Sequence, residues 1–130
     1  MKAICLSDIH GNDVKYRKLC GYIKQTLPDA VFIAGDVLPN YYVTEPLEFI
    51  DDTLKPLLSD LKEEMKQAYP DIFLITGNDD AAVSCEHLRY LELKGLIHFA
   101  NKLVMDQKGY TVLGYPYVPP TPFLLKDWEK

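Results

Sequence analysis

The sequence predicts an α/β fold built around a parallel sheet. Three short apolar runs, at residues 3–6, 30–34 and 72–75, have the length and composition of buried strands, and amphipathic helical patterns lie between them. This alternation favours parallel strands joined by helical crossovers. Each run stops at residues that can hold a metal ion or a phosphate. Because parallel strands end along one edge of their sheet, we expect the functional site at that edge.

Two helices are predicted between these strands. We expect Asp13 to cap the first helix and Pro28 to end it. Its buried face repeats at helical spacing and consists of Tyr16, Leu19, Cys20, Ile23 and Leu27. The second helix is longer, with Thr44 as its cap and a bend at Pro56, because proline lacks a backbone donor and clashes with the preceding turn. Its many charged residues are expected to form a solvent-facing side.

The pattern changes after the third strand. Ser84 is the predicted cap of a third helix, which Gly95 closes. Short strands are then expected at residues 96–99, 102–105 and 110–113, with a hairpin turn at 106–109. The sheet should thereby gain antiparallel members and become mixed.

Residues 114–130 form an irregular tail that is rich in proline and aromatic residues. Proline excludes regular helix or central strand here, yet so many aromatic residues are unusual for a disordered tail. Three interpretations stay open. The tail packs on its own domain, it forms a loop beside the site, or it carries a surface left bare because further chain is missing.

Composition limits the classes of function. The 130 residues, with 48% hydrophobic content, suit one domain, or part of one, across residues 1–130. The net charge of -5 argues against general binding to nucleic acids. The three cysteines form no short pair, and their odd number favours a reducing, cytoplasmic location over a disulfide framework. No run approaches the ~20 apolar residues of a membrane span, and the first residues do not form a signal peptide.

Four side chains at the three strand ends are candidate metal ligands. Asp8 and His10 are two residues apart, so in an extended segment both point to the same side. A carboxylate with an imidazole suits manganese, iron or zinc better than magnesium or calcium. Asp36 adds a carboxylate that can bridge two ions, and Asn78 adds a carbonyl oxygen. Sharp turns beside these ligands are expected at Gly11, Gly35 and Gly77.

These motifs resemble a known family. Ser7-Asp8-Ile9-His10-Gly11-Asn12, then Gly35-Asp36, then Gly77-Asn78-Asp79-Asp80 are similar to the first three motifs of the calcineurin-like metallophosphoesterases, over roughly residues 2–80. The resemblance implies the amino-terminal portion of an αββα sandwich with a binuclear metal site that hydrolyses phosphate esters. It implies that Asp8 and His10 hold the first metal, that Asp36 bridges, and that Asn78 holds the second. Asn12 and Asn78 become candidates for contact with the substrate.

The chain departs from the family pattern in two ways. Asp79 stands where many members have a histidine that helps protonate the leaving alcohol. Asp79 can act as the acid only if its surroundings raise its pKa, and otherwise it is a solvent-facing carboxylate. Asp80 is the other candidate catalytic residue of this motif. The later His and Gly-His-x-His motifs are missing, and His87 and His98 are expected to be structural or surface residues.

The missing motifs predict that these residues are the amino-terminal part of a longer phosphoesterase. One face of the sheet would then be bare, and a second copy or a complementary carboxy-terminal half would cover it. The first functional hypothesis is a hydrolase in which two divalent ions lower the pKa of a bridging water that attacks phosphorus. The alternative is a protein-binding scaffold whose catalysis is weak or lost. Receiver domains and aspartyl-phosphate phosphatases are disfavoured, because His10 stands where they have a second acid.

Overall fold

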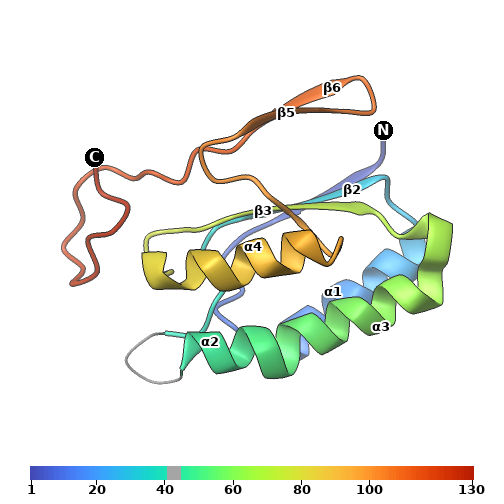
Figure 1. Ribbon diagram of the computed structural model, residues 1–130, viewed down its shortest axis with the longest axis horizontal. Helices are drawn as coiled ribbons and strands as arrows, with labels where there is room; N and C mark the ends of the chain where they lie inside the picture. The colour runs from blue at the N-terminus through green and yellow to red at the C-terminus, as the bar shows by residue number, and fades with distance from the viewer. Residues whose placement is uncertain (41–44) are drawn as a thin grey trace.

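A four-stranded parallel sheet forms the centre of the molecule (Figure 1). The structure is a computed structural model that describes residues 1–40 and 45–130. Across the sheet the strands follow their order in the chain: β1 (Ala3–Leu6), β2 (Ala30–Ala34), β3 (Asp71–Ile75) and β4 (His98–Phe99). Each strand runs parallel to its neighbour, so the predicted α/β class and the parallel core are confirmed.

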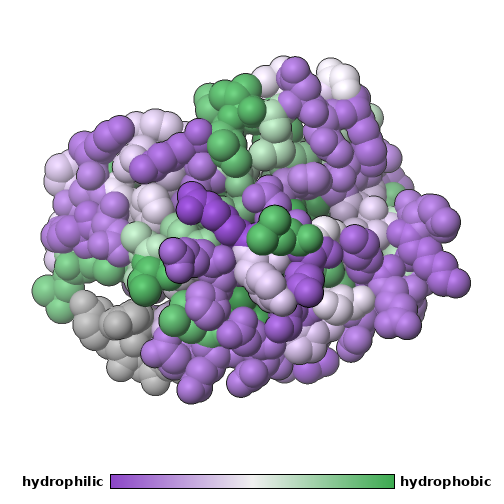
Figure 2. All heavy atoms as spheres, viewed as in Figure 1, coloured by the Kyte–Doolittle hydropathy of each residue, from purple (hydrophilic) through white to green (hydrophobic). Residues whose placement is uncertain are grey.

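The helices cover one face of this sheet. Figure 1 shows α1 (Asp13–Thr26), α3 (Lys55–Met65) and α4 (Cys85–Leu93) together on the same side of the strands. Their apolar sides pack on the strand residues that point toward them, and this contact forms the core. Its fully buried members include Tyr16, Ile23, Val31, Leu54, Leu74, Leu88 and Leu91. On the outside, the helices carry mostly hydrophilic side chains (Figure 2).

The other face of the sheet carries a row of side chains from adjacent strands. Cys5, Phe32, Phe73 and His98 are register partners across the four strands. The rings of Phe32 and Phe73 are stacked with their centres 5.1 Å apart, and the Phe73 and His98 rings are stacked at 4.9 Å. No helix of the described residues covers this row in Figure 1.

A hairpin lies over part of this second face. It consists of β5 (Val104–Gln107) and β6 (Tyr110–Leu113), which pair in antiparallel fashion. Of the three short strands predicted after Gly95, the first corresponds to the parallel β4, and only the other two are antiparallel, with the second at Val104–Gln107 instead of 102–105. The hairpin forms a two-stranded sheet of its own instead of joining the parallel one. The cover by the hairpin is incomplete, because a pocket of about 280 Å³ remains between the sheet and the hairpin, with Phe32, Phe73 and Tyr110 among its lining.

Asn12, and not Asp13, caps the first helix. The Oδ1 atom of Asn12 accepts a hydrogen bond from the backbone N–H of Lys15 at 3.0 Å, and Asn12 has the extended backbone of an N-cap. Asp13 is instead the first helical residue, and its carboxylate pairs with Arg17 one turn later at 2.9 Å. Leu27, with a left-handed backbone, ends the helix one residue before Pro28.

The long helix after β2 has three parts. A short α2 (Pro46–Phe49) leads into a π-helical segment, η1 (Ile50–Leu54), and then into α3. The irregularity expected at Pro56 takes the form of these wider turns, which place Pro56 in the first turn of α3, where its missing N–H is least costly. A 3₁₀ turn, η2 (Lys66–Ala68), follows. Thr44, the predicted cap, lies outside the described residues.

Ser84 precedes α4 as expected but does not cap it. It belongs to a 3₁₀ turn, η3 (Ala82–Ser84), with a helical backbone instead of the extended backbone of an N-cap, and its side chain makes no capping hydrogen bond. The Ser84 hydroxyl is buried without a hydrogen-bond partner among the described residues. Gly95 follows the end of the helix in a left-handed conformation, and its N–H donates to the Glu92 carbonyl at 2.8 Å. Nowhere in residues 1–40 and 45–130 is a helix long and apolar enough to cross a bilayer.

Asp71 ties the hairpin to the sheet. Its carboxylate lies 3.1 Å from the His98 Nε2 atom, accepts a hydrogen bond from Gln107 at 3.2 Å and pairs with the Lys108 ammonium at 2.9 Å. Burial opposes ionisation of this carboxyl group, but the hydrogen bonds from Lys108, His98 and Gln107 outweigh burial and lower the pKa of Asp71. The charged form is therefore the one that holds the hairpin.

This lowered pKa predicts a pH-dependent contribution of Asp71 to stability. The contribution is present above the unfolded-state pKa, about 3.9, and is lost as the pH falls through the lower folded-state pKa. Asp71→Asn should cost about 1 kcal/mol near neutral pH, a modest value because Lys108 is largely exposed. Urea unfolding from about pH 7 to about pH 3 should show the gap between wild type and variant closing in acid. If the stability difference between wild type and Asp71→Asn stayed constant with pH, the proposed role of the Asp71 charge would be contradicted. A constant difference is the result expected for the control Asp60→Asn, on the exposed side of α3.

Candidate metal centre

Three of the predicted ligands share an unusual backbone conformation. Asp8, His10 and Asp36 have φ values of +58°, +51° and +51°. Residues with a β-carbon rarely adopt this left-handed region, and they keep it only where the surrounding structure enforces it, often at functional sites. The sequence argument assumed an extended segment from Asp8 to His10. Left-handed turns, and not strand alternation, bring the two side chains together.

Hydrogen bonds between two loops enforce this conformation. The N–H of Asp8 donates to the Gly35 carbonyl at 3.1 Å, and the N–H of His10 donates to the Asp36 carbonyl at 2.9 Å. One residue further, the N–H of Gly11 donates to the carbonyl of Val37 at 3.0 Å. The parallel pairing of β1 with β2 thus continues past the ends of both strands. It fixes Asp8 and His10 relative to Asp36.

The end of β3 approaches the end of β2 so closely that only glycine fits. Gly77 does not have a left-handed backbone, but a β-carbon there would collide with the backbone nitrogen and the carboxylate of Asp36. Gly35 has a φ of +91°, and a β-carbon on it would lie 2.8 Å from the Cα atom of Gly77. These two glycines let the loop that carries Asn78 come beside the loop that carries Asp36.

Asp8, His10 and Asp36 together can hold a cation. One ligand atom from each of them lies within 4.8 Å of the other two, and the His10 Nε2 atom is 3.7 Å from the Asp8 Oδ1 atom. Ligand atoms about 2.0 to 2.2 Å from a single ion would be about 3 to 4.4 Å apart, so this group needs little adjustment to surround one. Its carboxylate and imidazole chemistry fits manganese, iron or zinc.

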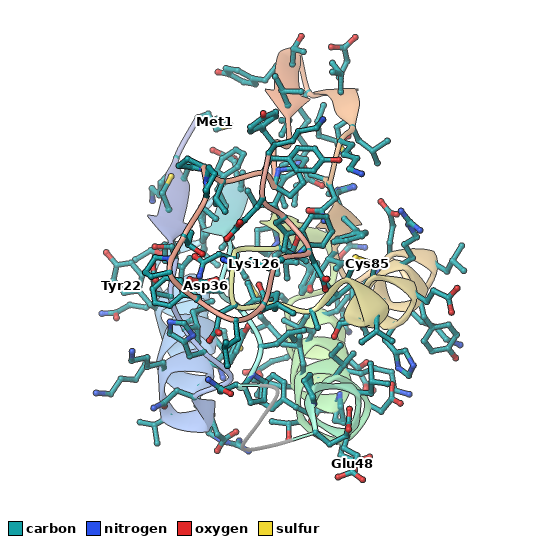
Figure 3. All side chains as sticks on the ribbon, turned by 90° about the vertical axis from the view of Figure 1, so that its left-hand side faces the viewer. Met1, Tyr22, Asp36, Glu48, Cys85 and Lys126 are labelled. Atoms are coloured by element: carbon teal, nitrogen blue, oxygen red, sulfur yellow. The ribbon has the colours of Figure 1, made fainter. Side chains whose placement is uncertain are left out.

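A pocket of about 520 Å³ opens above these residues at the carboxyl edge of the sheet. Its lining consists of Asp8, His10, Asp36, Asn40, Asn78, Asp79 and Phe123. The structure therefore brings all four predicted ligands, Asn78 included, to one pocket. Figure 3 looks onto this edge, with Asp36 labelled to the left of the centre of the view.

Asp79 faces His10 inside this pocket. The backbone N–H of Asp79 donates to the Oδ1 atom of Asp36 at 2.9 Å, and its Oδ2 atom lies 3.4 Å from the Nδ1 atom of His10. The two ring nitrogens of His10 therefore have different neighbours, Asp8 at Nε2 and Asp79 at Nδ1. A carboxylate beside the second nitrogen is the usual way to orient a metal-binding imidazole. This placement favours an orienting role for Asp79 over proton donation.

The charge of the pocket is strongly negative. Three carboxylates line it, and none of its described lining residues is a lysine or an arginine. Burial raises the pKa of Asp36, and the nearby carboxylates of Asp8 and Asp79 add to this effect, while the Asp79 N–H and His10 oppose it. An anionic substrate would be repelled from such a pocket. Bound cations would reverse the local charge.

Asp80 lies behind the pocket and not in it. Its side chain is 0% exposed and accepts hydrogen bonds from the backbone N–H groups of Val37 at 3.0 Å, Leu38 at 2.9 Å and Gly77 at 2.9 Å. Burial raises the pKa of Asp80 to about 6, against the effect of these three donors. Because the carboxylate faces backbone groups of two loops, its placement argues against the catalytic role predicted from the motif. Asp80 instead joins the loop after β2 to the loop after β3.

Asn12 is the other candidate whose placement argues against the predicted role. Its side chain caps α1 and is not among the residues that line the pocket. His87 and His98 also lie away from the pocket, beside Asp51 at 3.4 Å and Asp71 at 3.1 Å, so they have the surface and structural positions expected of them.

Two residues of the site were missed by sequence reasoning. Tyr16 is 1% exposed, and its hydroxyl donates to the Val37 carbonyl at 2.8 Å and supports the loop that carries Asp36. In the sequence, the only signal was its position on the buried face of the first helix, which does not indicate a role at the site. Phe123 comes from the tail and lines the pocket. The tail thus both packs on its own domain and reaches the site, and its aromatic content was the one signal for this.

Asp80→Ala should lower stability even without metal. The substitution leaves two buried backbone N–H groups and one part-buried one without their acceptor, and we expect a loss of about 2 to 4 kcal/mol in the free energy of unfolding. Urea denaturation in the presence of a chelator measures this effect apart from any bound ion. Asp60→Ala, on the exposed side of α3, is the matched control and should change stability by less than about 0.5 kcal/mol. Equal stability of the two variants would show that Asp80 does not hold the loops.

Comparison with known proteins agrees with this geometry. The comparison with curated proteins gave no match. The family model of the calcineurin-like phosphoesterases matches residues 1–122, which include all three strand-end motifs and the first part of the tail, 114–122. The parallel sheet interleaved with helices, followed by a short antiparallel sheet, is consistent with the amino-terminal part of that fold. The chain belongs to the calcineurin-like phosphoesterase family.

Proposed function

We propose that this protein is a metal-dependent phosphoesterase that hydrolyses a phosphate ester in the pocket at the carboxyl edge of the sheet. The family supplies the class of reaction. The observation that carries the proposal for this chain is the convergence of Asp8, His10 and Asp36, whose ligand atoms lie within 4.8 Å of one another. The cost of three left-handed backbones at these positions supports a functional reason for the arrangement.

We propose that the site takes two divalent cations, with manganese, iron or zinc as the candidates. Asp8 and His10 would hold the first cation, Asp36 would be shared by both, and Asn78 would hold the second. When bound, such cations supply Lewis-acid charge to phosphoryl oxygens and lower the pKa of water. The pocket has no lysine or arginine among its described lining residues, so this charge is what an anionic substrate requires.

The residues of the chain have separable tasks in this proposal. Asp79 orients the His10 ring through the contact of 3.4 Å at Nδ1, which leaves Nε2 facing Asp8. Asp80 holds the two loops at the spacing that the ligands need. The pairing of Asp8, His10 and Gly11 with the loop after β2 keeps the ligands in place before any ion binds, which lowers the cost of ordering them.

A protein-binding scaffold with weak or lost catalysis is the second candidate. Asp79 in place of the family histidine favours it, and so does the lack of further histidines at the pocket, since His87 and His98 lie elsewhere. The cytoplasm is the proposed location, supported by the three free cysteines, Cys5, Cys20 and Cys85.

Metal binding and turnover can be measured on the same samples. We expect manganese to raise the melting temperature of the protein and to support hydrolysis of an aryl phosphate, with both effects abolished by a chelator. Asp36→Asn should remove the thermal shift and lower kcat/KM by about 100-fold or more, because the shared ligand is lost. Asp60→Asn is the control and should behave as wild type.

The outcomes separate the two candidate functions. A thermal shift without turnover of any phosphate ester would favour the scaffold. The absence of both effects in wild-type protein would contradict the metal site itself.

We also propose that further polypeptide covers the open face of the sheet, either a second copy or a complementary carboxy-terminal half. The stacked row of Phe32, Phe73 and His98 and the incomplete cover by the hairpin support this.

When the chain is alone, a second copy is the available partner, so light scattering should give twice the monomer mass of 14.9 kDa. Phe32→Glu on the open face should shift the mass to that of a monomer, because it places a charge inside the contact. Leu93→Glu, at an exposed position on α4 at the helical side, should leave the dimer intact. A well-behaved wild-type monomer would count against the second copy.

A further inference from the structure

The tail closes into a loop that we call the tail loop, residues 118–130. The N–H of Val118 donates to the carbonyl of Trp128 at 2.9 Å, and the N–H of Lys130 donates to the carbonyl of Val118 at 3.0 Å. Within the loop, the Glu129 carboxylate accepts hydrogen bonds from the backbone N–H of Thr121 at 2.9 Å and from the Lys126 ammonium at 2.7 Å. The loop therefore has a defined shape although it contains no regular helix or paired strand.

Two contacts anchor the tail loop beside the metal centre. Trp128 is 6% exposed, and its indole N–H donates to the backbone carbonyl of Asp80 at 2.5 Å. The carboxylate of Asp127 accepts a hydrogen bond from the N–H of Ala82 at 2.7 Å. Both contacts go to the segment after β3, which also carries Asn78 and Asp79. The position of the loop is thus set by the same segment that forms one wall of the pocket.

Phe123 extends from this loop to the pocket. It is the one apolar residue among the described lining residues, and every other member of that lining is a carboxylate, an amide or an imidazole. Its side chain remains 56% exposed, so the ring is not there to fill the core. In Figure 3 the tail passes across the side of the molecule where Asp36 lies, with Lys126 of the loop close to it in that view. An aromatic wall beside a few polar groups is typical of a ligand site.

We propose that Phe123 determines specificity by contacting the alcohol group of the substrate, so that the site prefers phosphate esters of aromatic alcohols over esters of small aliphatic alcohols. This rests on the proposed function. In the hydrolysis, a water oxygen forms the new bond to phosphorus, the ester P–O bond breaks, and the alcohol leaves with a proton that the water supplied. The phosphate group occupies the metal end of the pocket, and the alcohol lies against the Phe123 ring.

The size of the effect follows from ring stacking and burial. An aromatic pair, together with the apolar area that it removes from water, corresponds to about a tenfold change in affinity. Benzyl phosphate and ethyl phosphate provide the comparison, because their alcohols are similar leaving groups and differ mainly in the ring. Wild type should prefer the benzyl ester by about tenfold in kcat/KM, mainly through KM. Phe123→Ala should lose this preference, with kcat/KM for the benzyl ester falling to about that for the ethyl ester.

A second measurement does not depend on turnover. Calorimetry of the manganese-loaded protein with benzylphosphonate and with methylphosphonate, which are not hydrolysed, reports recognition alone. Phe123→Ala should weaken binding of benzylphosphonate about tenfold more than binding of methylphosphonate. Phe123→Tyr should restore the preference, since it keeps the ring. Leu124→Ala is the matched control on the same loop, 82% exposed and outside the pocket lining, and should behave as wild type.

The two measurements keep this proposal distinct from the proposed function. Selective binding of benzylphosphonate that depends on Phe123, without hydrolysis of either ester, would support the recognition role and overturn the phosphoesterase. If both esters are hydrolysed and the ratio of their kcat/KM values is the same in wild type and Phe123→Ala, the phosphoesterase is supported and the recognition role of Phe123 is overturned. Equal loss of both phosphonates in the variant, or binding of neither by wild type, would overturn the role of Phe123.

Discussion

The close approach of the loops after β2 and β3 is the constraint on which the rest of the site depends. The buried Asp80 carboxylate accepts hydrogen bonds from three backbone N–H groups, two in the first loop and one in the second, and so holds the two loops together. The absence of a β-carbon at Gly35 and Gly77 makes the approach possible. Asp36 and Asn78 reach one pocket because of this contact. Burial of a charge is costly, and the three donors are what offset the cost.

The candidate metal centre lowers the stability of the metal-free protein in two ways. Asp8, His10 and Asp36 have left-handed backbones, and three carboxylates share one pocket without a basic residue in its described lining. A bound cation would lower only the second cost, because it would neutralise the carboxylates, while the left-handed backbones are already held by the hydrogen bonds between the loops. Such costs fit a general pattern in which proteins give up some stability at functional positions. The buried core beneath the site, which includes Val31, Leu74 and Leu91, supplies the stability that offsets these costs.

The two faces of the sheet are covered unequally, and this affects both the pocket and the surface open to a partner. Helices bury one face, while the row of Phe32, Phe73 and His98 on the other face has only the hairpin above it. The chain after the hairpin does not extend this cover, because it turns toward the carboxyl edge of the strands and anchors there through Trp128. The proline-rich tail is thus used at the pocket. The open face remains available to another polypeptide.

The sequence by itself determined the α/β class, the parallel core and the four candidate ligands whose side chains meet at the pocket. These follow from local properties: apolar periodicity defines buried strands and helices, and parallel strands must end at a shared edge. The tertiary structure alone decided that Asp80 holds loops, that Asn12 caps a helix, and that Phe123 reaches the pocket. These placements depend on how the folded chain positions a side chain relative to other parts of the structure. Asp80 meets Val37 across 43 residues, and Trp128 meets Asp80 across 48, and no local pattern encodes contacts of such separation.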